Sequence, residues 1–112
     1  MYMYNCKLVR VIDGDTVELD IDLGFAVTLR ERVRLEGVNT PEIRGRAAES
    51  AGFEAKAFVE DWFASWKKFE YWSNKYNKHD KYGRSLGTIV AVDRFEVVSD
   101  LNSTLQMKGW KS

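Results

Sequence analysis

The sequence contains one cysteine, one proline and one histidine. With Cys6 alone, an internal disulfide framework and a cysteine zinc motif are excluded, and a half-buried strand position is the expected role for that residue. With His79 alone, nucleases that combine a histidine base with histidine metal ligands are also excluded. Neither a Walker loop nor a Ser-His-Asp arrangement is present.

The start of the chain lacks the cationic stretch followed by an apolar stretch that marks a secretory leader. No window is apolar enough to suggest a membrane span. We therefore expect a soluble, cytoplasmic protein. At 112 residues we expect a single domain, residues 1–112, built around one core.

Net charge is lacking too, because 17 lysines and arginines balance 17 aspartates and glutamates. No global field therefore attracts nucleic acid, and any attraction must come from a local cluster. Such a basic rim could comprise Arg30, Arg32, Arg44, Arg46, Lys75, Lys78 and Lys81. An ordinary solvated face explains these residues equally well.

Two strand-like segments, Leu8 to Ile12 and Thr16 to Leu23, flank Asp13-Gly14. That dipeptide is typical of a tight hairpin turn because glycine tolerates positive φ. In the second segment apolar residues alternate with acidic ones, which predicts a strand with one solvated face.

The following strand also alternates, with Glu31 interrupting its apolar face. Because side chains alternate across a strand, the arginines are expected to point away from the core. The outward set is Arg30, Arg32 and Arg34, and the inward set is Val27, Leu29, Val33 and Leu35.

A helical period begins at Ala47 and continues to Trp66. Apolar side chains recur there every three or four residues and form a broad stripe, which is far more typical of a core-facing helix than of a ligand site. The stripe consists of Phe58, Val59, Trp62, Phe63 and Trp66.

Two further strands and a short helix are expected after this long helix. The strands are Lys67 to Ser73 and Leu86 to Val92; the helix takes Ser99 as its cap, directs Leu101 and Leu105 inward and ends near Gly109. Three strands, a helix, two strands and a terminal helix is the order of a five-stranded Greek-key barrel of the OB type.

Three short segments carry the chemistry: Val11 to Val17 (VIDGDTV), Val33 to Glu42 (VRLEGVNTPE) and Asp80 to Arg84 (DKYGR). They combine hard oxygen donors of the kind that calcium binds with arginines that can clamp a phosphate through two N–H bonds. In order and approximate spacing, these segments resemble the staphylococcal nuclease (thermonuclease) family. The resemblance extends from about Leu8 to Gly109.

This resemblance implies the same mainly β (α+β) OB barrel, with one long helix and a short C-terminal helix. It also implies a calcium-dependent endonuclease that hydrolyses phosphodiester bonds in DNA, with RNA as a further substrate. By position, the resemblance assigns the metal to Asp15, Asn39 and the Thr40 carbonyl. It places Asp13 just outside the inner shell of the metal.

By the same resemblance, Glu42 is the carboxylate that orients or activates the attacking water. Arg34 and Arg84 bind the scissile phosphate and stabilise the charge that develops on it. Lys81 and Tyr82 resemble contacts to a neighbouring phosphate. The products would carry a 3′-phosphate.

Asn39 is the main departure, because the family has an acidic residue at this position. An amide oxygen can still coordinate calcium, but one negative charge is lost and the affinity should fall. The alternative function is therefore a catalytically weak or inactive OB module that binds nucleic acid or a protein partner.

The ending is a second departure. Longer family members continue past the glycine matching Gly109 into a helix that carries a base-stacking tyrosine, whereas the sequence given ends at Ser112. We expect Trp110 or Tyr82 to substitute for that tyrosine if any residue does. We also expect either marginal stability or a weak homo-oligomer that covers the apolar surface left open.

Overall fold

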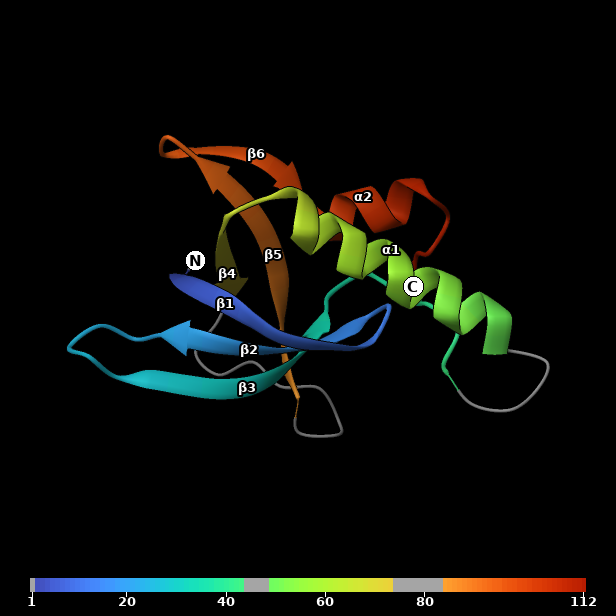
Figure 1. Cartoon of the computed structure of the whole chain (residues 1–112), viewed down its shortest axis with the longest axis horizontal. Coiled ribbons are helices and arrows are strands. Elements are labelled where there is room, and N and C mark those ends of the chain that lie inside the picture. The colour runs from blue at the N-terminus through green and yellow to red at the C-terminus, as the bar shows by residue number, and fades with distance from the viewer. Residues whose placement is uncertain (1, 44–48, 74–83) are drawn as a thin grey trace.

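The computed structural model describes residues 2–43, 49–73 and 84–112 (Figure 1). Its elements in chain order are β1 (Tyr2–Asp13), β2 (Thr16–Asp22), β3 (Thr28–Leu35), α1 (Glu49–Ser65), β4 (Lys68–Ser73), β5 (Ser85–Asp93), β6 (Glu96–Asp100) and α2 (Leu101–Met107). Neither helix in these described ranges combines the length and the apolar character needed to cross a bilayer.

The strands form a sheet in the order β3-β2-β1-β4-β5-β6, and β3 pairs in addition with β5. This extra pairing is parallel and places Val33 opposite Ser85 and Leu35 opposite Gly87. In the sheet, β3 and β5 are the two ends of the five-strand row β3-β2-β1-β4-β5. Their pairing therefore closes these five strands into a barrel. The predicted OB-type barrel with two helices is confirmed.

Alternating side chains of the strands fill the interior of the barrel, as their period predicts. Val17, Leu19 and Ile21 of β2 are buried, and α1 packs against β1 while α2 packs against β5 and β6. Leu101 and Leu105 of α2 are fully buried, which confirms their predicted inward direction. Cys6 is buried rather than half-buried, because it also belongs to this core.

The predicted inward face of β3 is correct for only half of its length. Val33 and Leu35 are fully buried, but Val27 and Leu29 are 51% and 42% exposed. The reason is that β5 covers β3 only from Val33 onwards. The tip of the β2–β3 hairpin, formed by the end of β2 and the start of β3, therefore extends beyond the barrel (Figure 1).

Three details near the helices also differ from the predictions. Trp66 follows the end of α1 and is 37% exposed, whereas Val59, Trp62 and Phe63 are buried as expected. A sixth strand, β6, pairs with β5 outside the barrel. Ser99 belongs to that strand, and the N-cap of α2 is Asp100, whose carboxylate accepts a hydrogen bond from the Ser103 amide.

Asn102 on α2 connects the barrel to the turn after β3. Its side chain is buried, and its Oδ1 accepts a hydrogen bond from the Ile89 amide at 3.2 Å. Its Nδ2 donates to the carbonyl oxygens of Glu36 at 2.8 Å and Gly87 at 3.0 Å. One side chain thus satisfies three backbone groups, two of β5 and one of the turn that leads to the candidate site.

Candidate active site

Asp15 lies in the turn between β1 and β2, and its side chain is only 11% exposed. Oδ1 accepts a hydrogen bond from the Thr16 hydroxyl at 3.0 Å. Oδ2 accepts one from the Thr40 amide at 3.2 Å, which fixes the segment after β3 to the turn after β1. The carboxylate therefore joins two of the three segments in which the sequence concentrates its chemistry.

Arg34 approaches the same carboxylate from β3. Its Nη1 donates hydrogen bonds to the carbonyl oxygens of Leu35 and Val38, and its Nη2 lies 3.5 Å from Asp15 Oδ2. The guanidinium is held on one edge by backbone carbonyls. The edge formed by Nε and Nη2 is the one with the geometry to engage a phosphate through two parallel bonds, and in this structure its Nη2 faces the Asp15 carboxylate.

Arg84 comes from the third segment, just before β5. Its Nη1 donates to the Thr16 hydroxyl at 3.3 Å, although the two residues are 68 positions apart. Because Thr16 also donates to Asp15, the two guanidiniums converge on one carboxylate with Thr16 between them.

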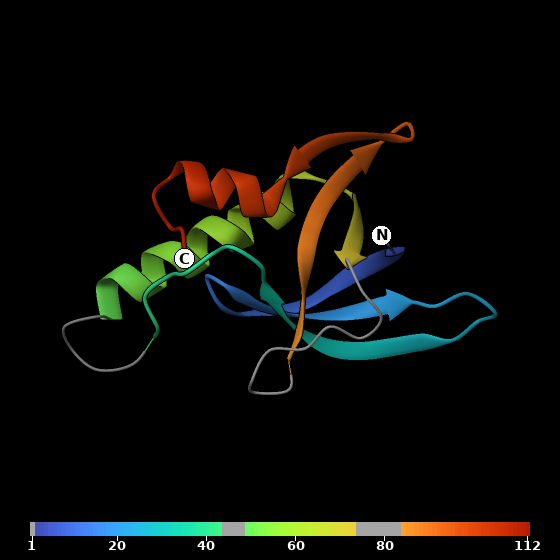
Figure 2. The ribbon, with the colours of Figure 1, turned by 180° about the vertical axis from the view of Figure 1, so that it is seen from behind.

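The segment after β3 passes the C-terminal residues and continues alongside α1 (Figure 2). Thr40 is buried, and within the described ranges its hydroxyl has no hydrogen-bond partner. Asn39 is exposed, while its backbone amide donates to the Trp110 carbonyl at 3.2 Å. Glu42 is also exposed to solvent.

Two glycines permit the close packing that holds this segment. A methyl group at Gly52 of α1 would lie 2.7 Å from the Glu42 carbonyl oxygen. A methyl group at Gly14 would lie 2.6 Å from the Ala55 Cβ and 2.8 Å from the Thr40 hydroxyl. Both positions therefore require glycine for steric reasons, and α1 fixes the backbone that carries Glu42.

Asp13 supports the same backbone from the other side. Its Oδ1 accepts a hydrogen bond from the Ile43 amide at 3.4 Å, next to Glu42. Asp13 therefore holds the backbone at Ile43, the residue that directly follows the candidate water-handling residue Glu42.

The oxygen atoms available here are of the type that a hard cation such as calcium binds. The Asp15 carboxylate retains acceptor capacity beyond its two hydrogen bonds, and the buried Thr40 hydroxyl is an oxygen without a partner in the described part of the chain. No group of three or more His, Cys, Asp and Glu side chains that could hold a metal occurs among the residues described. Further ligands would therefore be amide, backbone or water oxygens, which favours weak affinity.

Several predicted residues fall elsewhere. Lys81 and Tyr82 lie outside the described residues, as do Arg44, Arg46, Lys75 and Lys78 of the basic rim. The remaining rim members pair with β2: Arg30 contacts Asp20 at 2.9 Å and Arg32 lies 3.9 Å from Glu18. The Arg30 guanidinium accordingly lowers the pKa of the Asp20 carboxyl.

Trp110, suggested as a base platform, packs its ring edge-on against Phe58 with centroids 5.8 Å apart. It is half-buried and packs against the core, so only part of its ring is open to solvent.

Sequence reasoning missed the linking role of Thr16 and the close approach at Gly52. The Thr16 signal was present, since this residue ends the Asp-Gly-Asp-Thr motif. The Gly52 signal was weaker. A glycine inside a helix costs roughly 0.5–1 kcal/mol relative to alanine, so its presence calls for a packing reason.

Comparisons with known proteins show the family to which this chain belongs. A family model described as "Staphylococcal nuclease homologue" matches residues 32–110, a range that includes Arg34, Glu42 and Arg84. An uncharacterised protein of Methanocaldococcus jannaschii is 31% identical over 104 residues, which cover 77% of this chain and 48% of that protein. The chain therefore spans about half the length of this curated relative.

Proposed function

This chain belongs to the family of staphylococcal nuclease homologues, and on that premise we propose that it is a calcium-dependent nuclease acting on DNA and RNA. The observation that carries the proposal is the convergence of Arg34 and Arg84 on Asp15 through Thr16. A buried carboxylate flanked by two guanidiniums is an arrangement suited to one phosphate and one hard cation.

The two arginines have electrostatic roles in this proposal. Arg34 presents its Nε and Nη2 edge to the scissile phosphate, while its Nη1 stays anchored on the Leu35 and Val38 carbonyls. Arg84 approaches from β5 and stabilises the charge that develops as a fifth oxygen joins phosphorus. Donors that are held in place before the reaction lower its barrier because they need not reorganise during it.

Glu42 handles the water. Its backbone is fixed by the contact with Gly52 and by the neighbouring Ile43–Asp13 hydrogen bond, and the residue as a whole is exposed. In the proposed step the water oxygen bonds to phosphorus and its proton passes to Glu42. The P–O5′ bond breaks, the 5′ oxygen takes a proton from solvent, and the product keeps a 3′-phosphate.

Asp15, Asn39 and Thr40 would hold calcium in this proposal. Bound there, the ion would polarise the phosphate and add positive charge beside it. The residues proposed as ligands come from two segments that the Thr40–Asp15 hydrogen bond already holds together.

We expect hydrolysis of plasmid and single-stranded DNA with calcium and none with a chelator, because a carboxylate and two arginines cannot replace the charge of the divalent ion. A digestion series with calcium, with magnesium and with chelator measures this directly. Equal cutting in chelator would refute the calcium requirement.

Asn39→Asp should tighten calcium binding by about tenfold, since a carboxylate adds one charge opposite a divalent ion at contact distance. Calorimetry measures the affinity. Thr28→Asp adds the same charge at an exposed position at the start of β3 and serves as the control. Unchanged affinity for Asn39→Asp, or an equal gain in the control, would show that Asn39 is not a ligand.

A second candidate function is a binding module without hydrolysis, favoured by Asn39 at a ligand position. In that case the domain binds nucleic acid or a protein partner in the presence of calcium but hydrolyses no nucleic acid. The digestion series separates the two candidates, because the module predicts intact DNA in all three conditions.

A further inference from the structure

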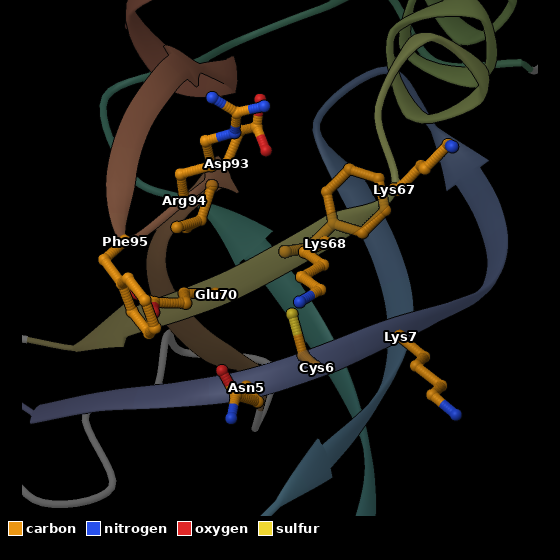
Figure 3. A pocket seen from close by; sticks show the side chains of 11 residues that line it. Asn5, Cys6, Lys7, Lys67, Lys68, Glu70, Asp93, Arg94 and Phe95 are labelled. Carbon is orange, nitrogen blue, oxygen red and sulfur yellow. The ribbon is translucent and has the colours of Figure 1, made fainter.

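A hollow of about 550 Å³ lies away from Asp15, between β1, β4 and the turn joining β5 to β6 (Figure 3). Its floor includes Cys6, and its margins carry Lys7, Lys67, Lys68, Arg94 and Phe95. Asn5 to Lys7 line it, so along β1 it lies roughly 25 Å from Asp13 at the other end of the strand. The hollow is thus distinct from the candidate active site.

The charges around this hollow differ from those on the rest of the barrel. None of its four cations has a carboxylate within 4.0 Å in the described part of the chain, whereas Arg10, Arg30, Arg32 and Arg34 all do. Of its two carboxylates, Glu70 already accepts a hydrogen bond from the Trp72 indole at 2.8 Å. Lys7 lies opposite Asp20 on β2 and adds to the lowering of the pKa of that carboxyl, so the excess positive charge comes from Lys67, Lys68 and Arg94. In a chain of zero net charge, three such cations against Glu70 and Asp93 favour an anion at this hollow.

The floor adds no charge. Burial, with a smaller effect of Glu70, raises the pKa of the Cys6 thiol to about 12, so the sulfur is neutral at physiological pH. A neutral floor beneath cationic margins suits a ligand that is both apolar and anionic. The volume also falls within the range of small-ligand pockets, roughly 300–1,000 Å³.

Phe95 supplies an aromatic face at the margin. Its ring is fully exposed, and its backbone φ of +68° lies in the left-handed region that disfavours residues other than glycine. The neighbouring Arg94 has a φ of +51°. Figure 3 shows Lys68 extending across the hollow, with Arg94 and Phe95 at one margin and Lys7 and Lys67 at the other.

We propose that this hollow is a second nucleic-acid site, which binds a single strand through phosphate contacts to its lysines and Arg94 and through a base stacked on Phe95. Cations beside an exposed ring are the combination by which single strands are held without sequence preference. A duplex fits less well, because its base faces are already stacked. The choice of nucleic acid as the ligand rests on the proposed function.

The test uses a labelled oligothymidylate and the whole chain in excess chelator, so that binding is measured without calcium-dependent cutting. Backbone amide signals of residues 5–7, 67–70 and 92–95 should shift on titration in a ¹⁵N NMR spectrum. Shifts confined to residues 13–16, 34–43 and 84 would place the strand at the candidate active site alone and overturn the proposal.

Phe25 provides a matched control for Phe95. It is equally exposed, at 102% against 104%, and has a φ of +53°. The hollow beside it shares Asn5 to Lys7 with the first hollow, but it has Asp20 and Asp22 where the first has Lys67, Lys68 and Arg94. Phe95→Ala should weaken binding in fluorescence anisotropy by about tenfold, the size expected for loss of one stacked base. Phe25→Ala should leave it unchanged. Equal effects of the two substitutions, or no effect of either, would refute stacking on Phe95.

Lys68→Ala tests the phosphate contact. The slope of log affinity against log salt should fall in magnitude by about 0.7, the value for one phosphate contact to a single strand. An unchanged slope would argue against the contact. Polyglutamate that competes as well as oligothymidylate would show a general anion site, as for an acidic protein partner, and would overturn the assignment to nucleic acid.

These outcomes are separable from those of the nuclease proposal. Phe95-dependent binding in chelator without any cutting in calcium would refute the nuclease and retain the second site. Calcium-dependent cutting of long single strands that is the same for wild type, Phe95→Ala and Lys68→Ala, with equal binding, would retain the nuclease and refute the second site.

Discussion

Arg84→Ala should lower the rate constant for phosphodiester hydrolysis by about 10³-fold, while calcium binding and the fold persist. In the proposed mechanism this guanidinium stabilises charge that develops only in the transition state, and loss of one such donor typically costs 10²–10³ or more. Single-turnover digestion of an oligonucleotide at saturating protein measures the effect. Arg84 is half-buried just before β5, and a thermal melt of the variant checks that the fold is kept.

Two further variants sharpen this experiment. Arg84→Lys keeps the charge but loses the planar fork, so it should recover only part of the lost rate. Arg30→Ala removes an equally charged side chain that is bonded to Asp20 on the hairpin, and it should cut at the wild-type rate. Full activity of Arg84→Ala, or an equal loss in Arg30→Ala, would show that Arg84 has no specific role in hydrolysis.

Asn102→Ala should reduce the free energy of unfolding by about 3 kcal/mol. Its amide serves the backbone groups of Ile89, Glu36 and Gly87 in a buried place, and each group left without a partner costs about 1–3 kcal/mol. For a domain of this size the midpoint of thermal unfolding should fall by roughly 10 to 25 °C. Chemical denaturation monitored by tryptophan fluorescence gives the free energy directly.

Asn5→Ala is the matched control, because this asparagine is exposed on β1. Its substitution should change the free energy of unfolding by less than about 0.5 kcal/mol. A loss below 1 kcal/mol for Asn102→Ala would mean that water replaces the amide and that α2 is not essential for closing the barrel.

The barrel strands were predictable because burial imposes a period of two on them. Val17, Leu19 and Ile21 show this period, and they are buried as it requires. β6 was not predictable in the same way. Its Val97 and Val98 are adjacent and both exposed, so no alternation distinguishes it from a loop.

Local signals also failed where tertiary contacts decide. The sequence shows inward parity through the whole of β3, yet Val27 and Leu29 extend past the part of the strand that β5 covers. Ser99 is a good cap by residue type, but its hydroxyl accepts a hydrogen bond from the Trp62 indole at 2.9 Å. Asp100 is therefore the N-cap residue of α2.

The candidate site was predictable in its members and not in its connections. The motif identified Asp15, Arg34 and Arg84, and parity gave the outward direction of Arg34. That a threonine hydroxyl lies between Asp15 and Arg84 depends on barrel closure, which no local pattern encodes. The requirement for Gly52 likewise depends on how closely α1 approaches the Glu42 backbone.

The parallel pairing of β3 with β5 has a consequence for the time at which this protein becomes functional. Chains are synthesised from the N-terminus at about 5–20 residues per second, so Thr16 precedes Arg84, 68 residues later, by roughly 3 to 14 s. From the synthesis of β3 until β5 emerges, the edge of β3 that β5 later covers lacks its strand partner, and one guanidinium of the site does not yet exist. A chain growing on the ribosome therefore cannot cut nucleic acid by the proposed mechanism until β5 has emerged and closed the barrel.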